Sequence, residues 1–142
     1  MTSRNEIEVE AAKPMLYFSH DADAATDIKC KKLVKRFGME GYGRWWRMCE
    51  LMAGTEGHAL CVETPEDAEI LAEELLFEEL SECMLFLEQL KEIGLIRMPG
   101  NGTLYSESLI RRSYYFGKKR AAGRKGGKAS KKGKNKQSLS TA

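Results

Sequence analysis

The stretch "LIRMPGNGTLYSES", residues 95–108, decides the fold, because it carries the clearest β-hairpin signal in the chain. Two short segments, 95–98 and 103–106, flank the tetrapeptide Pro-Gly-Asn-Gly. Asn-Gly is the strongest short hairpin signal, and a type I′ turn needs positive φ at both of its central residues. The sequence therefore predicts a hairpin whose turn is centred on Asn101-Gly102.

Two helices are predicted directly before this hairpin. Thr64 can cap the first helix and Pro65 suits its first helical position. Apolar residues then recur with helical spacing over 65–76. A second apolar helical face covers 80–93. No Gly, Pro or Asn separates the two helices, so the turn between them is expected near 76–79.

A helix predicted over 27–37 has one apolar face and one cationic face. It begins at a cap on Thr26 or Asp27 and ends at Gly38. Its cationic face carries no acid and consists of Lys29, Lys31, Lys32, Lys35 and Arg36. Such a face is ordinarily solvated surface, and the lack of acids makes a phosphate-contacting patch a serious alternative.

The following segment, 38–57, is predicted to contain the most buried helix. Trp45 and Trp46 lie on or next to one wide apolar stripe with helical spacing. A stripe of this kind is more typical of a protein core than of a base-stacking surface. Short strands are predicted on either side of this pair of helices, at 15–21 and 58–63.

The predicted order of elements is that of a winged helix. Helix, helix, short strand, helix, helix and two-stranded hairpin make a helix-turn-helix with a wing. In that fold 80–93 is the helix that ordinarily reads DNA, and 95–106 is the wing. The predicted fold class is therefore mainly α with a small β-hairpin: a winged helix-turn-helix domain over 15–120, after a flexible N-terminus (1–14) and before a disordered basic tail (121–142).

The formal net charge of +2 conceals an acidic body and a cationic C-terminal segment. Residues 111–142 hold 12 of the 23 Lys and Arg residues and none of the 21 Asp and Glu residues. Residues 1–110 therefore carry 11 basic and 21 acidic residues, a net charge of −10. A block of like charges without aromatic residues predicts disorder beyond Ala121. Its charge favours contact with nucleic-acid phosphates without sequence readout.

The predicted DNA-binding residues are the five cations of the 27–37 helix and ten cations of the C-terminal segment, Arg111, Arg112, Lys118, Lys119, Arg120, Arg124, Lys125, Lys128, Lys131 and Lys132. The nominal reading helix is not included. Residues 78–93 carry five Glu and one Lys, a net charge of −4 that a duplex would repel. Gln89 is the only amide there for a base-edge contact.

Three stretches resemble the N-terminal domain of phage and prophage replisome-organiser proteins. They are "YFSHDADAATDIKCKKLVKRFGMEGYGRWWRMCEL" (17–51), the wing "GLIRMPGNGTLYSESLIRR" (94–112) and "AAGRKGGKAS" (121–130). The resemblance implies a winged-helix fold related to DnaD-type primosomal proteins. It also implies a role in starting phage DNA replication, and partners among replication proteins such as a helicase or its loader.

No enzymatic activity, cofactor or metal site is predicted. "GRKGGKAS" (123–130) is one residue too short for a phosphate-binding loop and has Ala129 in place of Ser or Thr. Asp21, Asp23 and Asp27 lack the Gly and the closing Glu of a calcium loop, so a helix cap explains them better. The four cysteines form no CxxC pair and are predicted to be reduced thiols, packed as small hydrophobic residues.

The sequence predicts a cytoplasmic protein without membrane contact. Its first residues are acidic and polar, unlike a secretory signal, and no apolar run approaches the roughly 18 residues that span a membrane. Two classes of function stay open. The first is a DNA-associated replication accessory. The second is a protein–protein interaction or homo-oligomerisation module whose tail is only electrostatic background, and a phage transcriptional regulator is a further alternative.

Overall fold

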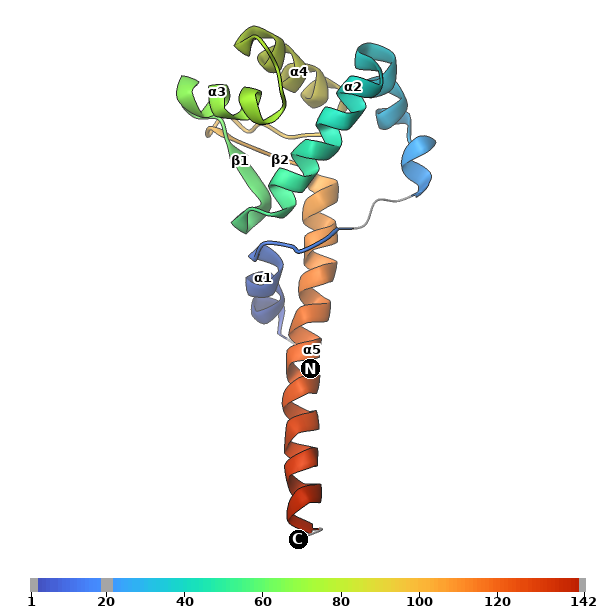
Figure 1. Cartoon of the computed structure of the whole chain (residues 1–142), viewed down its shortest axis with the longest axis vertical. Helices are drawn as coiled ribbons and strands as arrows, with labels where there is room; N and C mark the ends of the chain where they lie inside the picture. Colours follow the sequence, from blue (N-terminus) through green and yellow to red (C-terminus); the bar gives the residue numbers. More distant parts are fainter. Residues whose placement is uncertain (1–2, 19–21, 141–142) are drawn as a thin grey trace.

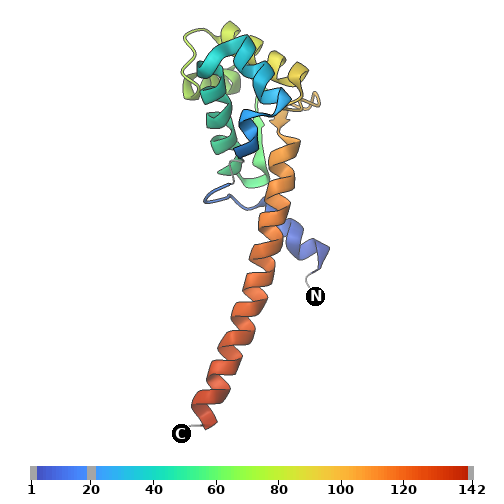
Figure 2. The same ribbon diagram turned by 90° about the vertical axis from the view of Figure 1, so that its right-hand side faces the viewer.

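A computed structural model describes residues 3–18 and 22–140 of the chain, with side chains as far as Gly123. Figures 1 and 2 show a helical head from which one long helix, α5, extends. In chain order the elements are α1 (Arg4–Ala12), the 3-10 turn η1 (Ala22–Ala25), α2 (Ile28–Ala53), η2 (Glu56–His58), β1 (Ala59–Cys61), α3 (Pro65–Glu74), α4 (Leu80–Ile93), β2 (Thr103–Tyr105) and α5 (Glu107–Ser140).

The predicted break at Gly38 is present, as a kink inside α2. Gly38 has φ 69° and ψ −166°, outside the helical region, so two helical segments meet there. Asp27 caps the first segment, because its carboxylate accepts a hydrogen bond from the Lys29 amide at 2.7 Å. The second segment is the core helix that the sequence predicts, with Trp45 5% exposed and Met48 completely buried.

α3 and α4 form the predicted helix-turn-helix. Thr64 and Asp67 satisfy each other's backbone amides in a capping box at the start of α3. The turn lies where it is predicted, and Leu76 reverses the chain there with a left-handed φ of 58°. Gly94, with φ 97°, ends α4 in the same left-handed region. α2, α4 and the sheet enclose the core, which contains Leu33, Met52, Phe86, Leu87 and Leu104 among others.

The wing is present, and its sheet includes the strand that precedes α3. β1 and β2 are antiparallel, with Leu60 opposite Leu104. The first arm of the wing, residues 95–98, pairs with β2 through one bridge between Arg97 and Tyr105. The backbone amides and carbonyls of these two residues exchange hydrogen bonds at 2.8 and 3.1 Å. The structure is therefore mainly helical with a small antiparallel sheet, a helix-turn-helix with a wing.

The turn of the wing differs from the predicted type I′ turn. Positive φ occurs at Gly100 (88°) and Gly102 (81°) and not at Asn101. The Asn101 side-chain oxygen instead accepts hydrogen bonds from the amide and the hydroxyl of Thr103, at 3.2 and 2.6 Å. This local side-chain contact replaces the left-handed conformation that a type I′ turn would require of Asn101.

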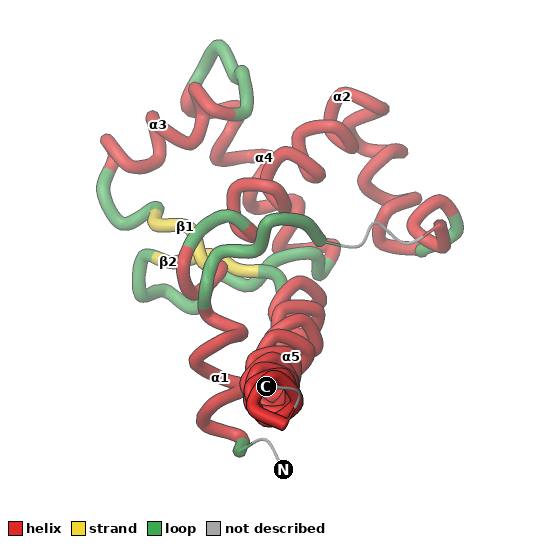
Figure 3. The backbone as a smooth tube through the Cα atoms, turned by 60° about the horizontal axis from the view of Figure 1, so that its bottom comes forward, coloured by secondary structure: helices red, strands yellow, loops and turns green. Residues whose placement is uncertain are grey.

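Residues 4–12 form helix α1, where the sequence predicts a flexible segment. A capping box between Ser3 and Glu6 starts the helix, and Figure 3 shows α1 lying along α5. Buried His58 ties its end to α2. The His58 Nε2 atom lies 2.6 Å from the Ala11 carbonyl oxygen, and Nδ1 lies 3.2 Å from that of Met52. The surface that orders α1 comes from distant parts of the chain, which a local pattern does not reveal.

The strand predicted at 15–21 is wrong over its described part, because residues 15–18 form no strand. Met15 is buried and its amide donates to the Ala53 carbonyl at 2.8 Å. Phe18 stacks on Trp46, with ring centroids 6.1 Å apart. Met15 and Phe18 therefore cover the core, whereas Leu16 and Tyr17 are exposed, and residues 19–21 lie outside the described residues.

α5 continues as a helix to Ser140, whereas the sequence predicts disorder from residue 121. Its first part is held by packing, since Leu109, Ser113 and Ala121 are buried. Once a helix is nucleated in this way, each further residue adds one backbone hydrogen bond. Four glycines in 121–140 act against the helix, so residue propensity alone does not explain its length. No helix within the described residues is long and apolar enough to cross a lipid bilayer.

Candidate nucleic-acid interface

Two of the five predicted α2 cations hold α2 against α4. Lys29 Nζ donates to the carbonyl oxygen of Gly94 at 3.1 Å, at the negative end of the α4 dipole. Arg36 Nη1 donates to the Gln89 side chain at 2.6 Å, and its Nη2 lies 3.5 Å from a Glu92 carboxylate oxygen. These two cations have a structural role, so they are weaker candidates for phosphate contacts.

The other three cations of this face, Lys31, Lys32 and Lys35, are exposed. They form no ion pair among the described residues. Lys31 and Lys35 are one helical turn apart, so their ammonium groups share a side of the helix. A patch of three cations without a compensating acid can contact the phosphates of a nucleic acid.

The predicted cations of α5 also divide by role. Arg111, Lys118 and Lys119 are exposed, whereas Arg112 and Arg120 are half-buried. Arg120 lies 4.6 Å from the centroid of the Phe116 ring and donates to the Pro14 carbonyl at 3.3 Å, so it also supports the fold. The remaining five predicted residues lie on α5 with side chains outside the described part: Arg124, Lys125, Lys128, Lys131 and Lys132.

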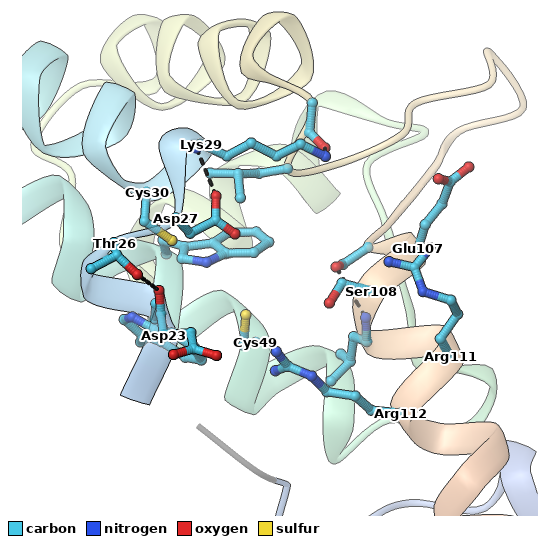
Figure 4. Close-up of a pocket in the computed structure, with 17 residues that line it drawn as sticks. Asp23, Thr26, Asp27, Lys29, Cys30, Cys49, Glu107, Ser108, Arg111 and Arg112 are labelled. Atoms are coloured by element: carbon cyan, nitrogen blue, oxygen red, sulfur yellow. Dashed lines mark hydrogen bonds between the residues drawn. The ribbon is translucent and has the colours of Figure 1, made fainter. Parts of the chain in front are cut away.

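One cleft brings cations of both predicted regions together. This α2–α5 cleft, of about 520 Å³, lies between the start of α2 and the start of α5 (Figure 4). Lys29, Arg111 and Arg112 line it. Its walls also contain three carboxylates, those of Asp23, Asp27 and Glu107. The acids balance the cations, so this cleft is not a simple anion site.

Two buried thiols also line the α2–α5 cleft. Burial raises the pKa of Cys30 and raises that of Cys49 to about 12, and the charge of Arg112 offsets part of both effects. Figure 4 shows the Arg112 side chain reaching toward Cys49. Burial likewise raises the pKa of Cys83 to about 11. These three thiols stay protonated at neutral pH and are poor nucleophiles, as expected for small core residues, whereas Cys61 is exposed.

A second cleft, which the sequence analysis missed, lies between residues 15–18 and α5. This aromatic cleft, of about 430 Å³, shares Ser108, Arg111 and Arg112 with the first one. Four rings contribute to its walls, those of Tyr17, Phe18, Tyr115 and Phe116. Its α5 residues recur every three or four positions from 108 to 119, a helical face that the sequence does contain. The approach of residues 15–18 to that face has no local signal.

No three His, Cys, Asp or Glu side chains among the described residues gather closely enough to hold a metal ion. The chemistry that this surface offers is therefore charge and aromatic stacking. The exposed cations of the predicted set lie on the first segment of α2 and along α5, and Arg111 and Lys119 of α5 also line the aromatic cleft.

A family model described as Lin1244/Lin1753-like, N-terminal, matches residues 17–109. The match includes the α2 cations, the helix-turn-helix and the wing, and it stops within the first turn of α5. No curated protein and no solved structure matches the chain. Because the matched region is more than half of the sequence, the chain belongs to the Lin1244/Lin1753-like family through its N-terminal domain.

Proposed function

We propose that this protein is a phage-type DNA replication accessory, similar to replisome organisers, that binds DNA without sequence preference through the backbone phosphates. The observation that carries the proposal is the position of the cations. Lys31, Lys32 and Lys35 are exposed on α2, and the acid-free cationic segment 111–140 lies on the helix that extends from the head (Figure 2). A cationic helix can follow phosphates without reading bases.

The exposed acids and the engaged amide of α4, the usual reading helix of this fold, support placing DNA on α2 and α5 instead. Glu82 and Glu88 are exposed on α4 and would face the phosphates. Gln89, its one amide, accepts a hydrogen bond from Arg36 and donates one to Glu92 at 3.4 Å. A bidentate base-edge contact by this amide would compete with both hydrogen bonds.

The replication role rests on the resemblance to replisome organisers, whose winged helix is related to DnaD-type primosomal proteins. In this proposal α2 and α5 hold DNA, and the acidic surface of α4 faces a replication protein such as a helicase or its loader. A basic partner surface would complement the exposed Glu82 and Glu88.

A second candidate function is a protein–protein interaction or homo-oligomerisation module. It is favoured by apolar side chains that α4 and the turn before it leave in solvent, since Leu76 of the turn is 81% exposed and Leu85 of α4 is 58% exposed. Exposed apolar groups among acids are typical of a protein-binding surface. Light scattering on the wild type and on Leu85→Ser would separate a self-associating module from a monomer.

The proposed function is tested by the affinity of the full chain for several unrelated duplexes of equal length, measured by fluorescence anisotropy. We expect equal affinities for all sequences. The variant Lys31→Gln/Lys32→Gln/Lys35→Gln should bind more weakly, whereas Lys91→Gln, an exposed Lys of α4, serves as the control and should not change binding. Wild-type affinity in the triple variant, or strong preference for one duplex, would contradict the proposal.

A further inference from the structure

We propose that the aromatic cleft binds an unpaired base of a single-stranded nucleic acid. The inference rests on the proposed function, because it names the form of nucleic acid that the α5 surface takes. The volume of the aromatic cleft, about 430 Å³, lies in the range typical of small-ligand sites, roughly 300–1,000 Å³. Two elements far apart in the sequence, the 15–18 loop and α5, supply the walls.

Two of the four rings in this cleft are exposed to a degree that core packing does not explain. Tyr17 is 70% exposed and Tyr115 is 62% exposed. Phe18 and Phe116, in contrast, are half-buried and pack against the core. Tyr17 meets the Phe116 ring edge-to-face, with centroids 5.2 Å apart and an interplanar angle of 89°, so the pair gives the cleft a fixed aromatic corner.

Cations flank the exposed rings along the same face of α5. Arg111 and Lys119 lie one turn before and one turn after Tyr115, and the Lys119 ammonium is 4.8 Å from the centroid of its ring. A base stacked on Tyr115 would take the ring face opposite Lys119 or displace that ammonium, and in both cases Arg111 and Lys119 would lie near the flanking phosphates. Aromatic faces combined with a cationic groove are the usual means of binding single strands without sequence preference.

The composition of the lining separates this cleft from its neighbour. Its described lining residues include no Asp or Glu and three cations, of which Lys119 is its own and Arg111 and Arg112 are shared, whereas three carboxylates line the α2–α5 cleft. A polyanion is thus favoured over a cationic or neutral ligand. Bases in an intact duplex have their faces covered by neighbouring pairs, so they would reach the cleft only after unstacking. The cleft therefore selects single strands over duplex.

The test uses the full chain, a labelled oligothymidylate, an oligouridylate of equal length and a duplex of equal length. For Tyr17→Ala/Tyr115→Ala we expect single-strand affinity to fall by roughly 5- to 150-fold for each stacked base that is lost. Duplex affinity should stay unchanged. Tyr17→Phe/Tyr115→Phe keeps both rings and should bind as the wild type does. Tyr114→Ala, an exposed α5 residue outside the cleft lining, is the matched control.

Each outcome of these binding measurements supports or overturns the base site in the aromatic cleft. Wild-type single-strand affinity in the double Ala variant would overturn the base site while leaving duplex binding, and so the proposed function, intact. Equal losses for single strands and duplex, or a loss in the Phe variant as well, would also overturn it. A wild-type chain that binds no nucleic acid would overturn both proposals. The two oligonucleotides show whether DNA or RNA is preferred once the tyrosine dependence is established.

Discussion

Gly117 of α5 lies directly against Ala11 of α1. A Cβ atom placed on Gly117 would be 2.5 Å from the Ala11 backbone nitrogen and 2.7 Å from its Cβ. The two helices approach this closely because residue 117 has no side chain. Ala11 in turn offers its carbonyl oxygen to buried His58, so the position of α1 is coupled to the end of α2.

Gly117→Ala should displace α1 and lower stability, because a methyl group there meets backbone atoms that cannot yield easily. Overpacking of this kind costs about 1–3 kcal/mol, partly offset by the roughly 1 kcal/mol gain in helix propensity. Gly123→Ala is the control, since a Cβ there meets nothing within 4 Å. Hydrogen exchange of the α1 amides and thermal unfolding measure both variants. Unchanged α1 protection in Gly117→Ala would contradict the close crossing.

Trp45→Ala should destabilise the head by roughly 3–5 kcal/mol, as expected for removal of a large buried aromatic side chain. Trp45 is 5% exposed in the core helix. Trp46 is half-buried and stacks on Phe18, so Trp46→Ala should cost less. Urea unfolding of the two variants gives the comparison. A larger loss for Trp46 than for Trp45 would show that the register of the core helix is wrong.

Two glycines of the wing should respond differently to the same substitution. Both have left-handed φ, so Gly100→Ala and Gly102→Ala share a backbone cost of roughly 1–2 kcal/mol. Only at Gly102 would the added Cβ collide with a neighbour, 2.6 Å from the Cβ of Glu63. Gly102→Ala should therefore unfold at a lower urea concentration than Gly100→Ala. Equal midpoints would argue against the packing of the wing on residue 63.

One cysteine should react quickly with a thiol reagent at pH 8 in the native protein. Cys61 is exposed, whereas Cys30, Cys49 and Cys83 are buried with raised pKa values. A raised thiol pKa means less thiolate at a given pH, so these three stay unreactive until pH approaches their pKa or the chain unfolds. Cys61→Ser should abolish the fast phase. A second fast thiol in that variant would contradict the burial of the core cysteines.

The elements with local signals are the ones that sequence alone predicts correctly. Thr64 and Pro65 mark the start of α3, and Gly94 marks the end of α4, because caps and glycine stops act within a few residues. The sequence does not predict α1 or the course of residues 15–18, since α1 packs on distant α5 and the 15–18 loop contacts both α2 and α5. At the turn of the wing, a side-chain hydrogen bond of Asn101 replaces the expected conformation.

The candidate site shows the same division. The exposed cations Lys31, Lys32 and Lys35 follow from the helical spacing of the sequence. The contacts that Lys29 and Arg36 make with α4 and its end do not follow from the sequence, because their partners are distant in the chain. The helical face of α5 from 108 to 119 can be recognised in the sequence. The position of residues 15–18 against that face, which completes the aromatic cleft, cannot.

The central claim is that phosphate contacts from α2 and α5 carry DNA binding. Its most direct test is the salt dependence of duplex affinity for the full chain and for a variant with Gln at the five outer α5 cations, Arg124, Lys125, Lys128, Lys131 and Lys132. Each neutralised phosphate adds about −0.9 to the slope of log K against log salt, so about six contacts give a slope near −5 in the wild type.

In the variant the slope should become shallower by as much as about 4.5, with a matching loss of affinity at low salt. An unchanged slope, together with tight binding of one duplex sequence, would contradict the account and make the winged helix itself the reader of DNA.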